Sequence, residues 1–439
     1  MSFLSRLRAS TSMWIQEKSK RSPVLASILT LLTGTMISQV VVFFFQIFIN
    51  RVYTDQDKGL LGVYGTVTTF VIAVAALRFD LTIVLPKSDV AARVLKKLAT
   101  RAIVVSAMLT SLASIVLANV LIEYYHHSVE LSRWLMISGV TVFAIAEITN
   151  IQYWLTREAK FGVLASNRVL QSVATAGLQL LFGLLMHGGL SALMIGTLSG
   201  QLITLIVLKF RTPELREPLP EDAPRMRDLA RRYKDMPLLN GPNVLVDAIR
   251  NMGINLLIGA YAIAALGQFQ VAWAIMQVPV ALVVGSISQV FLKKLSTVER
   301  GKMMPLLAYT LKRTALVSAL VFGILFFITP WLIPFVFGPQ WVLAGQFGQA
   351  LTPWLFMMVL TSPFSSIFVV TENQKTMLIF AIFYAIVPLS WLVWSPLELL
   401  PTIYVLAALM AVMLSIMLVL SFWVARKYDR GTEPVSEEA

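Results

Sequence analysis

The sequence contains no cysteine, and only 13% of its 439 residues are charged. The absence of cysteine excludes disulfides, thiolate nucleophiles and metal sites built on sulfur ligands. Three histidines are too few for a histidine-rich metal centre. No GxxxxGK[ST] pattern occurs, so the chain is not expected to hydrolyse ATP itself. Soluble domains carry roughly 25% charged residues, and the low value here excludes an ordinary globular enzyme.

The sequence is instead rich in long apolar segments, and 57% of its residues are hydrophobic. Each long apolar run provides the ~20 residues that cross a bilayer. The predicted fold class is therefore an all-α integral membrane protein with about twelve transmembrane helices. They cover roughly residues 24–49, 59–86, 102–122, 133–156, 163–186, 190–208, 238–262, 265–291, 309–333, 346–370, 376–395 and 401–424.

Several local features of these spans carry further predictions. The first apolar run is longer than the core of a cleavable signal peptide, so we expect it to remain as a span. The fifth and sixth spans are joined by the tight turn His187-Gly188-Gly189. Pro279 and Pro363 lie inside predicted spans, where a kink is tolerated.

The positions of lysine and arginine predict the orientation. Of the 36 basic residues, 31 fall in segments on one side, whereas only Arg51, Lys58 and Arg133 fall on the other. Because basic residues are enriched in cytoplasmic loops, both termini are predicted to be cytoplasmic. The same confinement to short loops argues against a nucleic-acid partner, despite a net charge of +13.

A proline-rich, charged segment at 209–237 separates six spans from six. A shift of 205 residues aligns polar positions of the two halves, such as Ser38 with Asn243 and Gln46 with Asn251. We therefore predict two six-helix bundles related by a pseudo-two-fold axis along the membrane normal. The predicted parts are an amphipathic cytoplasmic segment at 1–22, bundles at 23–208 and 238–425, the linker 209–237 and a cytoplasmic tail at 426–439.

Polar residues form a stripe on the seventh span, within an arc of about 140° at 100° per residue. The stripe consists of Asn240, Asn243, Asp247, Arg250, Asn251 and Asn255. A milder stripe on the first span includes Gln39 and Gln46. Hydrogen bonds within a sealed helix interface and a water-filled cavity both explain such stripes. We favour the cavity, because each charge at the bilayer centre costs at least ~2.5 kcal/mol.

Other intramembrane charges lie in the second and fourth spans. Arg78 and Asp80 are two residues apart, so on a helix they face different sides and need separate partners. Glu147 fits an ion-coupling role and a structural ion pair equally well. The GTLSG segment at 196–200 is better interpreted as a helix-packing motif.

Longer segments resemble the polysaccharide transporter (Wzx-type O-antigen flippase) branch of the multidrug/oligosaccharidyl-lipid/polysaccharide (MOP) exporter superfamily. The resemblance covers roughly residues 24–425 and rests on RFDLTIVLPKSDVAARVLKKL, INRVYTDQDKGLLGVYGTV, QYWLTREAKFGVLASNRVLQSV, ALGQFQVAWAIMQVPVALVVGSISQVFLKK and FGPQWVLAGQFGQALTPWLFMMVLTSPFSSIFVVTENQK. Phe79 and Asp80 stand where the family more often has Tyr and Glu.

The resemblance implies a MATE-like fold with a V-shaped cavity that opens alternately to each side. It also implies the substrate, an undecaprenyl-diphosphate-linked oligosaccharide (an O-antigen, exopolysaccharide or capsule repeat unit) moved to the outer leaflet of the bacterial inner membrane. Membrane lipids, a polymerase and glycosyltransferases of the same pathway are the other expected partners. No cofactor is expected, and protons or sodium ions are expected to drive transport.

Site predictions follow from the stripes and this substrate. Asp247, Asp80 and Glu147 are the predicted ion-coupling residues, and no metal site is predicted. The predicted substrate-binding residues are Arg78, Arg250, Arg51, Asn240, Asn243, Asn251, Asn255, Gln39 and Gln46.

Three alternatives stay open. A lipid II flippase and a multidrug or cation exporter belong to the same superfamily. A membrane polysaccharide polymerase or ligase would need a large outer loop, and no predicted outer loop exceeds about a dozen residues. The outer Asp55-Gln56-Asp57 is therefore interpreted as structural rather than as the acidic pair of a glycosyltransferase.

Overall fold

The computed structural model describes residues 23–117, 128–234, 236–295, 298, 301–371 and 373–431. The predicted amphipathic segment 1–22 and most of the predicted tail lie outside these residues. Over the described ranges the regular elements are all helical. Eleven helices are long and apolar enough to cross a membrane, or twelve if a pair bent by 49° is one span. The predicted all-α fold of about twelve spans is confirmed.

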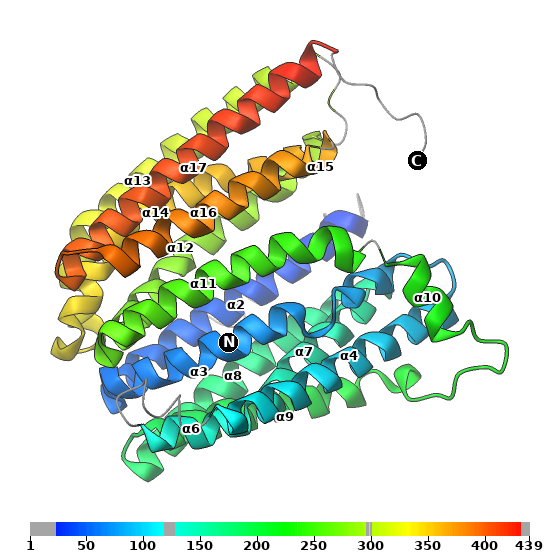
Figure 1. The fold of residues 1–439 in the computed structure, drawn as a ribbon, viewed down its shortest axis with the longest axis horizontal. Helices are drawn as coiled ribbons and strands as arrows, with labels where there is room; N and C mark the ends of the chain where they lie inside the picture. Colours follow the sequence, from blue (N-terminus) through cyan, green and yellow to red (C-terminus); the bar gives the residue numbers. More distant parts are fainter. Residues whose placement is uncertain are drawn as a thin grey trace, which may run out of the picture. The chain divides into compact units, whose positions relative to one another are not determined.

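The chain divides into two compact units. Unit 1 comprises Met1–Val52, Val71–Val120 and Val129–Gly241. Its elements are α2 (Pro23–Val52), the end of α3, η1 (Phe79–Val84), α4 (Asp89–Val116), α6 (Val129–Met136), α7 (Ser138–Arg157), α8 (Phe161–Met186), α9 (Leu190–Phe210), η2 (Pro213–Leu215), α10 (Met226–Arg232) and η3 (Met236–Asn240) (Figure 1).

Unit 2 comprises Tyr53–Phe70, Leu121–Ser128 and Pro242–Ala439. It contains most of α3 (Asp55–Ala75), which begins in this unit and ends in the other. Its further elements are α11 (Gly241–Tyr261), α12 (Ile263–Leu295), α13 (Met303–Phe337), η4 (Pro339–Trp341), α14 (Val342–Thr361), η5 (Ser362–Ser366), α15 (Ile367–Val370), α16 (Gln374–Trp394) and α17 (Leu399–Asp429).

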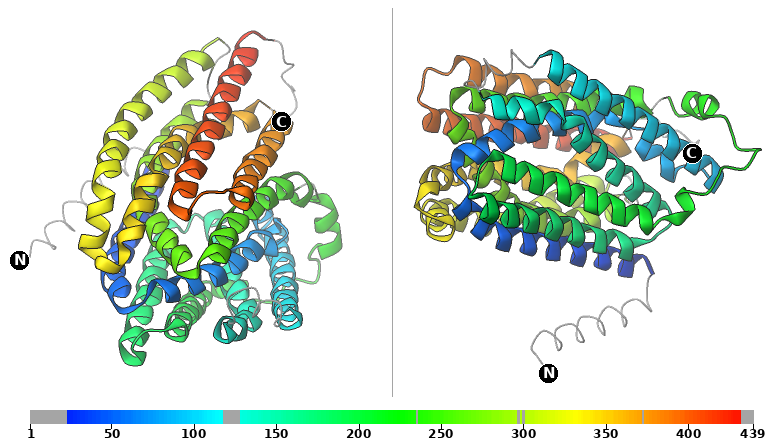
Figure 2. Two further views of the ribbon diagram at one scale, coloured as in Figure 1. Left: turned by 60° about the vertical axis from the view of Figure 1, so that its left-hand side comes forward. Right: turned by 90° about the horizontal axis from the view of Figure 1, so that it is seen from below.

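In unit 1, α8 and α9 form an antiparallel hairpin, which Figure 2 shows side by side, and α2 packs along α8. The predicted turn is confirmed, because His187, Gly188 and Gly189 have φ of 59°, 88° and 88°. The GTLSG motif packs as predicted. A Cβ added to Gly196 would lie 2.6 Å from the backbone of Gln179, so only glycine permits this close approach.

The second span differs from the prediction, and one continuous helix over 59–86 is wrong. The helix α3 ends at Ala75, Leu77 and Arg78 adopt left-handed φ of 48° and 59°, and η1 follows. Neither glycine nor proline occurs in this stretch, so no local signal marked the break. The break lets Phe79 pack into a buried cluster with Ala99 and Ile103 of α4.

The predicted linker is partly folded onto unit 1. The short helix α10 packs on α4, and its Leu229 is buried beside Trp154 and Leu95. Glu214 accepts hydrogen bonds from Lys160 Nζ (2.7 Å) and Trp154 Nε1 (3.2 Å). Burial alone raises the pKa of Glu214, but these hydrogen bonds and one from the backbone outweigh it and lower the pKa below its usual value.

In unit 2, α3 and α12 approach so closely that side chains are excluded at their contact. A Cβ on Gly59 would lie 1.9 Å from the carbonyl oxygen of Ile263, and one on Gly267 would lie 1.9 Å from that of Asp55. Gln268 donates to Asp55 Oδ2 (3.1 Å), while Asp57 accepts from the backbone N–H of Thr54 (3.0 Å). The acidic residues at 55 and 57 therefore hold the start of α3, which agrees with their structural interpretation.

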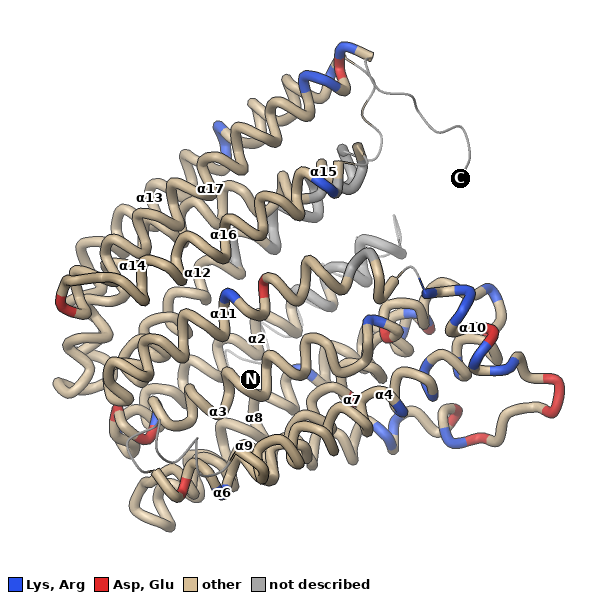
Figure 3. Tube along the Cα trace, viewed as in Figure 1, with Lys and Arg blue, Asp and Glu red and all other residues tan. Residues whose placement is uncertain are grey.

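Charge is unevenly distributed within each unit. Figure 3 shows Lys and Arg gathered around α10 and the adjoining ends of the unit 1 helices, whereas the long helices of both units are largely free of charged residues. The few charges that do lie along these helices are consequently the candidates for function.

Candidate functional site

Arg250 on α11 is the centre of a polar group in unit 2. Its Nη1 donates to Asp247 Oδ1 (2.8 Å), and its Nη2 lies 3.4 Å from Asn251 Oδ1. The guanidinium carbon lies 4.3 Å from the ring centroid of Tyr384 on α16, a cation–π geometry. The Arg250 side chain is 11% exposed and that of Asp247 is 57% exposed. A cation is thus held inside the unit beside a carboxylate that solvent or a ligand can reach.

Aromatic residues from three helices support this arginine. The Tyr384 hydroxyl accepts a hydrogen bond of 3.0 Å from Trp354 Nε1 on α14. The Trp354 ring lies 4.8 Å from that of Trp273 on α12, which in turn stacks on Phe269 at 6.1 Å. Each of these contacts restricts the ring before it, so Tyr384 has little freedom to move. The Arg250 guanidinium therefore packs against a rigid aromatic surface.

The guanidinium retains unused hydrogen-bonding capacity. Arg250 Nε is buried and has no hydrogen-bond partner among the residues that the structure describes. Five N–H donors in a planar fork match the oxygens of a phosphate or carboxylate. An anionic group that reached Arg250 would therefore compete with Asp247 for the same donors.

The remaining predicted residues of this stripe are separated. Asn255 accepts a hydrogen bond from Gln270 Nε2 (3.2 Å) on α12, away from Arg250 along the helix. Asn243 Oδ1 is buried without a partner in the described part of the chain. The side chain of Asn240 lies outside the described residues. The structure thus brings together Asp247, Arg250 and Asn251 out of the six predicted positions.

Unit 1 contains a polar pocket of about 520 Å³ between α2, α8 and α9. It is lined by Thr35, Ser38, Gln39, Val42, Gln46, Arg168, Gln171, Ser172, Thr175, Ala176, Gln179 and Gln201. The predicted residues Gln39 and Gln46 therefore lie in one pocket. The α8 and α9 side of the lining, including Arg168 and Gln201, was missed. A stripe was there to be found, because Arg168, Gln171, Thr175 and Gln179 recur at helical spacing.

Arg78 and Asp80 lie at the break between α3 and η1. The left-handed φ of Arg78 breaks the helix here, so the two residues do not lie on one continuous helix as predicted. Arg78 Nε and Asp80 Oδ1 are buried, and neither atom has a hydrogen-bond partner within the described ranges. Arg51, also predicted to bind the substrate, lies exposed in the last turn of α2.

Glu147 is fully engaged in the interior of unit 1. It is 1% exposed and accepts hydrogen bonds from Lys96 Nζ, Thr100 Oγ1 (2.9 Å) and Asn150 Nδ2 (3.1 Å). Lys96 belongs to α4, which starts at Asp89, so the third span begins earlier than the predicted residue 102. Three donors around one buried carboxylate favour the structural ion pair over ion coupling.

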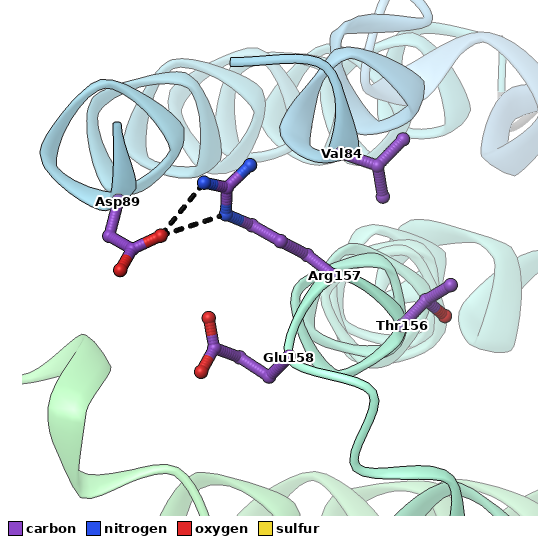
Figure 4. A pocket seen from close by; sticks show the side chains of 5 residues that line it. All are labelled: Val84, Asp89, Thr156, Arg157 and Glu158. Atoms are coloured by element: carbon purple, nitrogen blue, oxygen red, sulfur yellow. Dashed lines mark hydrogen bonds and ion pairs between the residues drawn. The ribbon is translucent and has the colours of Figure 1, made fainter. Parts of the chain in front are cut away.

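A second pocket of unit 1, about 500 Å³, lies where α7 ends and α4 begins. In Figure 4 the Arg157 guanidinium points from α7 to Asp89, and Glu158 lies across the opening from it. Arg157 Nη2 donates to Asp89 Oδ1 (2.7 Å), and the same guanidinium donates to the carbonyl oxygens of Ile83, Pro86 and Lys87. Arg157 thus stabilises the turn after η1, and little of its hydrogen-bonding capacity is left for a ligand.

Solved structures of transporters share this fold. The lipid II flippase MurJ in an inward closed conformation matches 92% of the chain and 90% of its own, with a TM-score of 0.72 and 14% identity. An inward-facing MATE multidrug resistance transporter matches 93% and 99%, with a TM-score of 0.62 and 14% identity. A MOP superfamily transporter from Pyrococcus furiosus, described as having a binding pocket of reverse polarity, matches 93% and 97%, with 0.60 and 14%. No curated protein gives a significant match.

The class is therefore a multi-pass membrane protein with the fold of the MOP transporters. A family model described as "Polysaccharide biosynthesis protein" matches residues 48–345, more than half of the chain. The chain belongs to this polysaccharide biosynthesis family.

Proposed function

We propose that this protein is a flippase for a lipid-linked oligosaccharide, an undecaprenyl-diphosphate-linked repeat unit carried from the inner to the outer leaflet of the bacterial cytoplasmic membrane. The observation that carries the proposal is Arg250, a cation held inside an apolar unit on an aromatic surface, with donors left for an anion. Membership of a polysaccharide biosynthesis family supports the glycan, and the likeness to a lipid II flippase supports the lipid carrier.

The charges fit an anionic headgroup. Charge-assisted hydrogen bonds from arginine are the strongest match for phosphate oxygens in a poorly solvated space. We place the diphosphate at Arg250, with Arg78 and Arg51 as further contacts during its passage. Asn243, Asn251 and Asn255 supply amide groups for sugar hydroxyls. A cation exporter would instead need carboxylates without a neighbouring cation, whereas Asp247 is paired with Arg250.

The proposal is tested by reconstitution. Purified protein in liposomes is given a fluorescent short-chain polyprenyl-diphosphate oligosaccharide in one leaflet, and a membrane-impermeant quencher reports its transfer. We expect transfer to exceed that of protein-free liposomes by at least tenfold. Transport of a cationic dye in place of this lipid would overturn the proposal.

The orientation gives a second expected outcome. Because 31 of 36 basic residues favour one side, reporter fusions at residues 215 and 435 should both report a cytoplasmic location. The measurement is paired alkaline phosphatase and green fluorescent protein fusions in a bacterial host. Phosphatase activity from either position would contradict the even number of spans.

Ion coupling is proposed at Asp247. An anionic headgroup that takes the Arg250 donors would release Asp247, whose exposed carboxylate could then bind a proton or sodium ion. Asp247→Asn should therefore make flipping insensitive to an imposed proton or sodium gradient, although basal flipping continues. The measurement compares initial rates with and without the gradient. If the variant responds as the wild type does, Asp80 or Glu147 becomes the better candidate.

A further inference from the structure

Among the described residues that line the unit 1 pocket, Arg168 is the single charged side chain. We infer that this pocket binds a carboxylate-bearing sugar residue of the transported oligosaccharide, separately from the diphosphate. This inference rests on the proposed function, because it concerns the glycan of the same substrate.

The positive charge of Arg168 is not neutralised by an acidic side chain among the residues that the structure describes. Its Nη1 donates to Thr35 Oγ1, which is a neutral hydroxyl. Lys96, Arg157 and Lys160, by contrast, each pair with a carboxylate in the same unit. No ion pair joins Arg168 to any acid over the described ranges. A half-buried guanidinium without a counter-ion favours an anionic ligand, which would supply the missing charge.

The single positive charge of Arg168 matches a carboxylate ligand better than a diphosphate. One guanidinium matches one carboxylate through two parallel hydrogen bonds. A diphosphate carries more negative charge than one arginine neutralises, and the described lining residues include no second cation. Its volume of about 520 Å³ lies within the roughly 300–1,000 Å³ typical of small-molecule sites.

The neutral part of the lining suits sugar hydroxyls. Gln171 Nε2 donates to Gln201 Oε1 (2.8 Å), and Gln179 Nε2 donates to Thr197 Oγ1 (2.8 Å), so three of the glutamines are held in place by the protein. An amide offers both donors and acceptors, and each sugar hydroxyl uses both.

One hydroxyl of the lining still lacks a hydrogen-bond partner among the described residues. Thr175 Oγ1 is buried without a hydrogen bond in the part of the chain that is described. Polar side chains that only fasten helices together pair with one another. An unsatisfied hydroxyl and an uncompensated arginine in one pocket are instead an arrangement that a polar, anionic ligand completes.

Soluble probes test the pocket directly. Thermal stabilisation of the purified protein in detergent is measured with sodium glucuronate and with glucose, which differ at the carboxylate. We expect the wild type to bind glucuronate at least tenfold more tightly than glucose. Arg168→Gln should remove this difference, and Arg168→Lys should restore it partly, because an ammonium lacks the fork. Equal binding of both probes by the wild type would overturn the inference.

Matched variants separate the pocket from general charge effects. Arg211→Gln removes an exposed arginine of the same unit that bonds to Ser166 outside the pocket, and it should leave the preference unchanged. If Arg168→Gln does not fold, Gln201→Leu gives a second test, since it removes a lining amide and should weaken glucuronate binding.

Flipping assays separate this inference from the proposed function. Two polyprenyl-diphosphate glycans are compared that differ only in a glucuronate or a glucose residue. We expect the wild type to flip the glucuronate lipid faster, and Arg168→Gln to flip both equally. If the wild type flips neither lipid, the proposed function fails. If it flips both at one rate that Arg168→Gln does not change, the proposed function stands and the inference fails.

Discussion

Arg250→Ala is expected to reduce flipping of the diphosphate-linked oligosaccharide by about 10- to 100-fold, with normal protein levels in the membrane. Hydrogen bonds to charged groups contribute about 1.5–3 kcal/mol, and a tenfold change corresponds to about 1.4 kcal/mol. Folding should tolerate the change, because the Asp247 carboxylate left behind is 57% exposed and can be solvated. The measurement is the initial rate in proteoliposomes, normalised to the reconstituted protein.

Two further variants test the contributions of the planar guanidinium of Arg250 and of its aromatic contact. Arg250→Lys should restore only part of the rate, since a point charge cannot bind two phosphate oxygens in parallel. Tyr384→Leu, which removes the ring under the guanidinium, should reduce the rate less than Arg250→Ala does, because a cation–π contact contributes about 0.5–2 kcal/mol. Full activity of Arg250→Ala would remove this residue from the mechanism.

Most of the fold could be predicted from the sequence because hydropathy and span length depend on composition alone. The break after Ala75 could not. Leu77 and Arg78 adopt a left-handed conformation that glycine favours, and the packing of Phe79 against α4 compensates for it. Long-range packing of this kind leaves no mark on the local sequence. The docking of Leu229 onto α4 escaped prediction for the same reason.

The candidate site was predictable in part. The stripe on α11 placed Arg250 next to Asp247, because residues three apart on a helix are neighbours. The aromatic support from α12, α14 and α16 was not predictable, since it depends on the contact between Arg250 and Tyr384, which are more than 100 positions apart. Lys96 and Arg168 were interpreted only as markers of the cytoplasmic side. Both lie near the ends of spans, where a long side chain can reach either solvent or the interior, and here they reach the interior.

Lys96 shows how strongly protein stability depends on whether such a side chain reaches the interior. Glu147→Leu would leave the Lys96 ammonium, whose side chain is 12% exposed, without its carboxylate. Breaking a buried pair by removing one partner costs about 3–5 kcal/mol, a large share of the roughly 5–15 kcal/mol that stabilises a folded protein. We therefore expect Glu147→Leu to lower membrane levels several-fold, measured by immunoblot, and to lower the melting temperature of the purified protein.

The double variant Lys96→Met/Glu147→Leu separates a structural role from ion coupling. Replacing both charges by apolar side chains of similar size removes the unpaired ammonium, so stability should return to near the wild-type value. If Glu147 is structural, as its three donors favour, the double variant should flip the substrate and respond to a proton or sodium gradient. A double variant that folds and flips but no longer responds would show instead that Glu147 carries the coupling ion. Asp247→Asn would then retain its response, so the two carboxylates are distinguished by one assay.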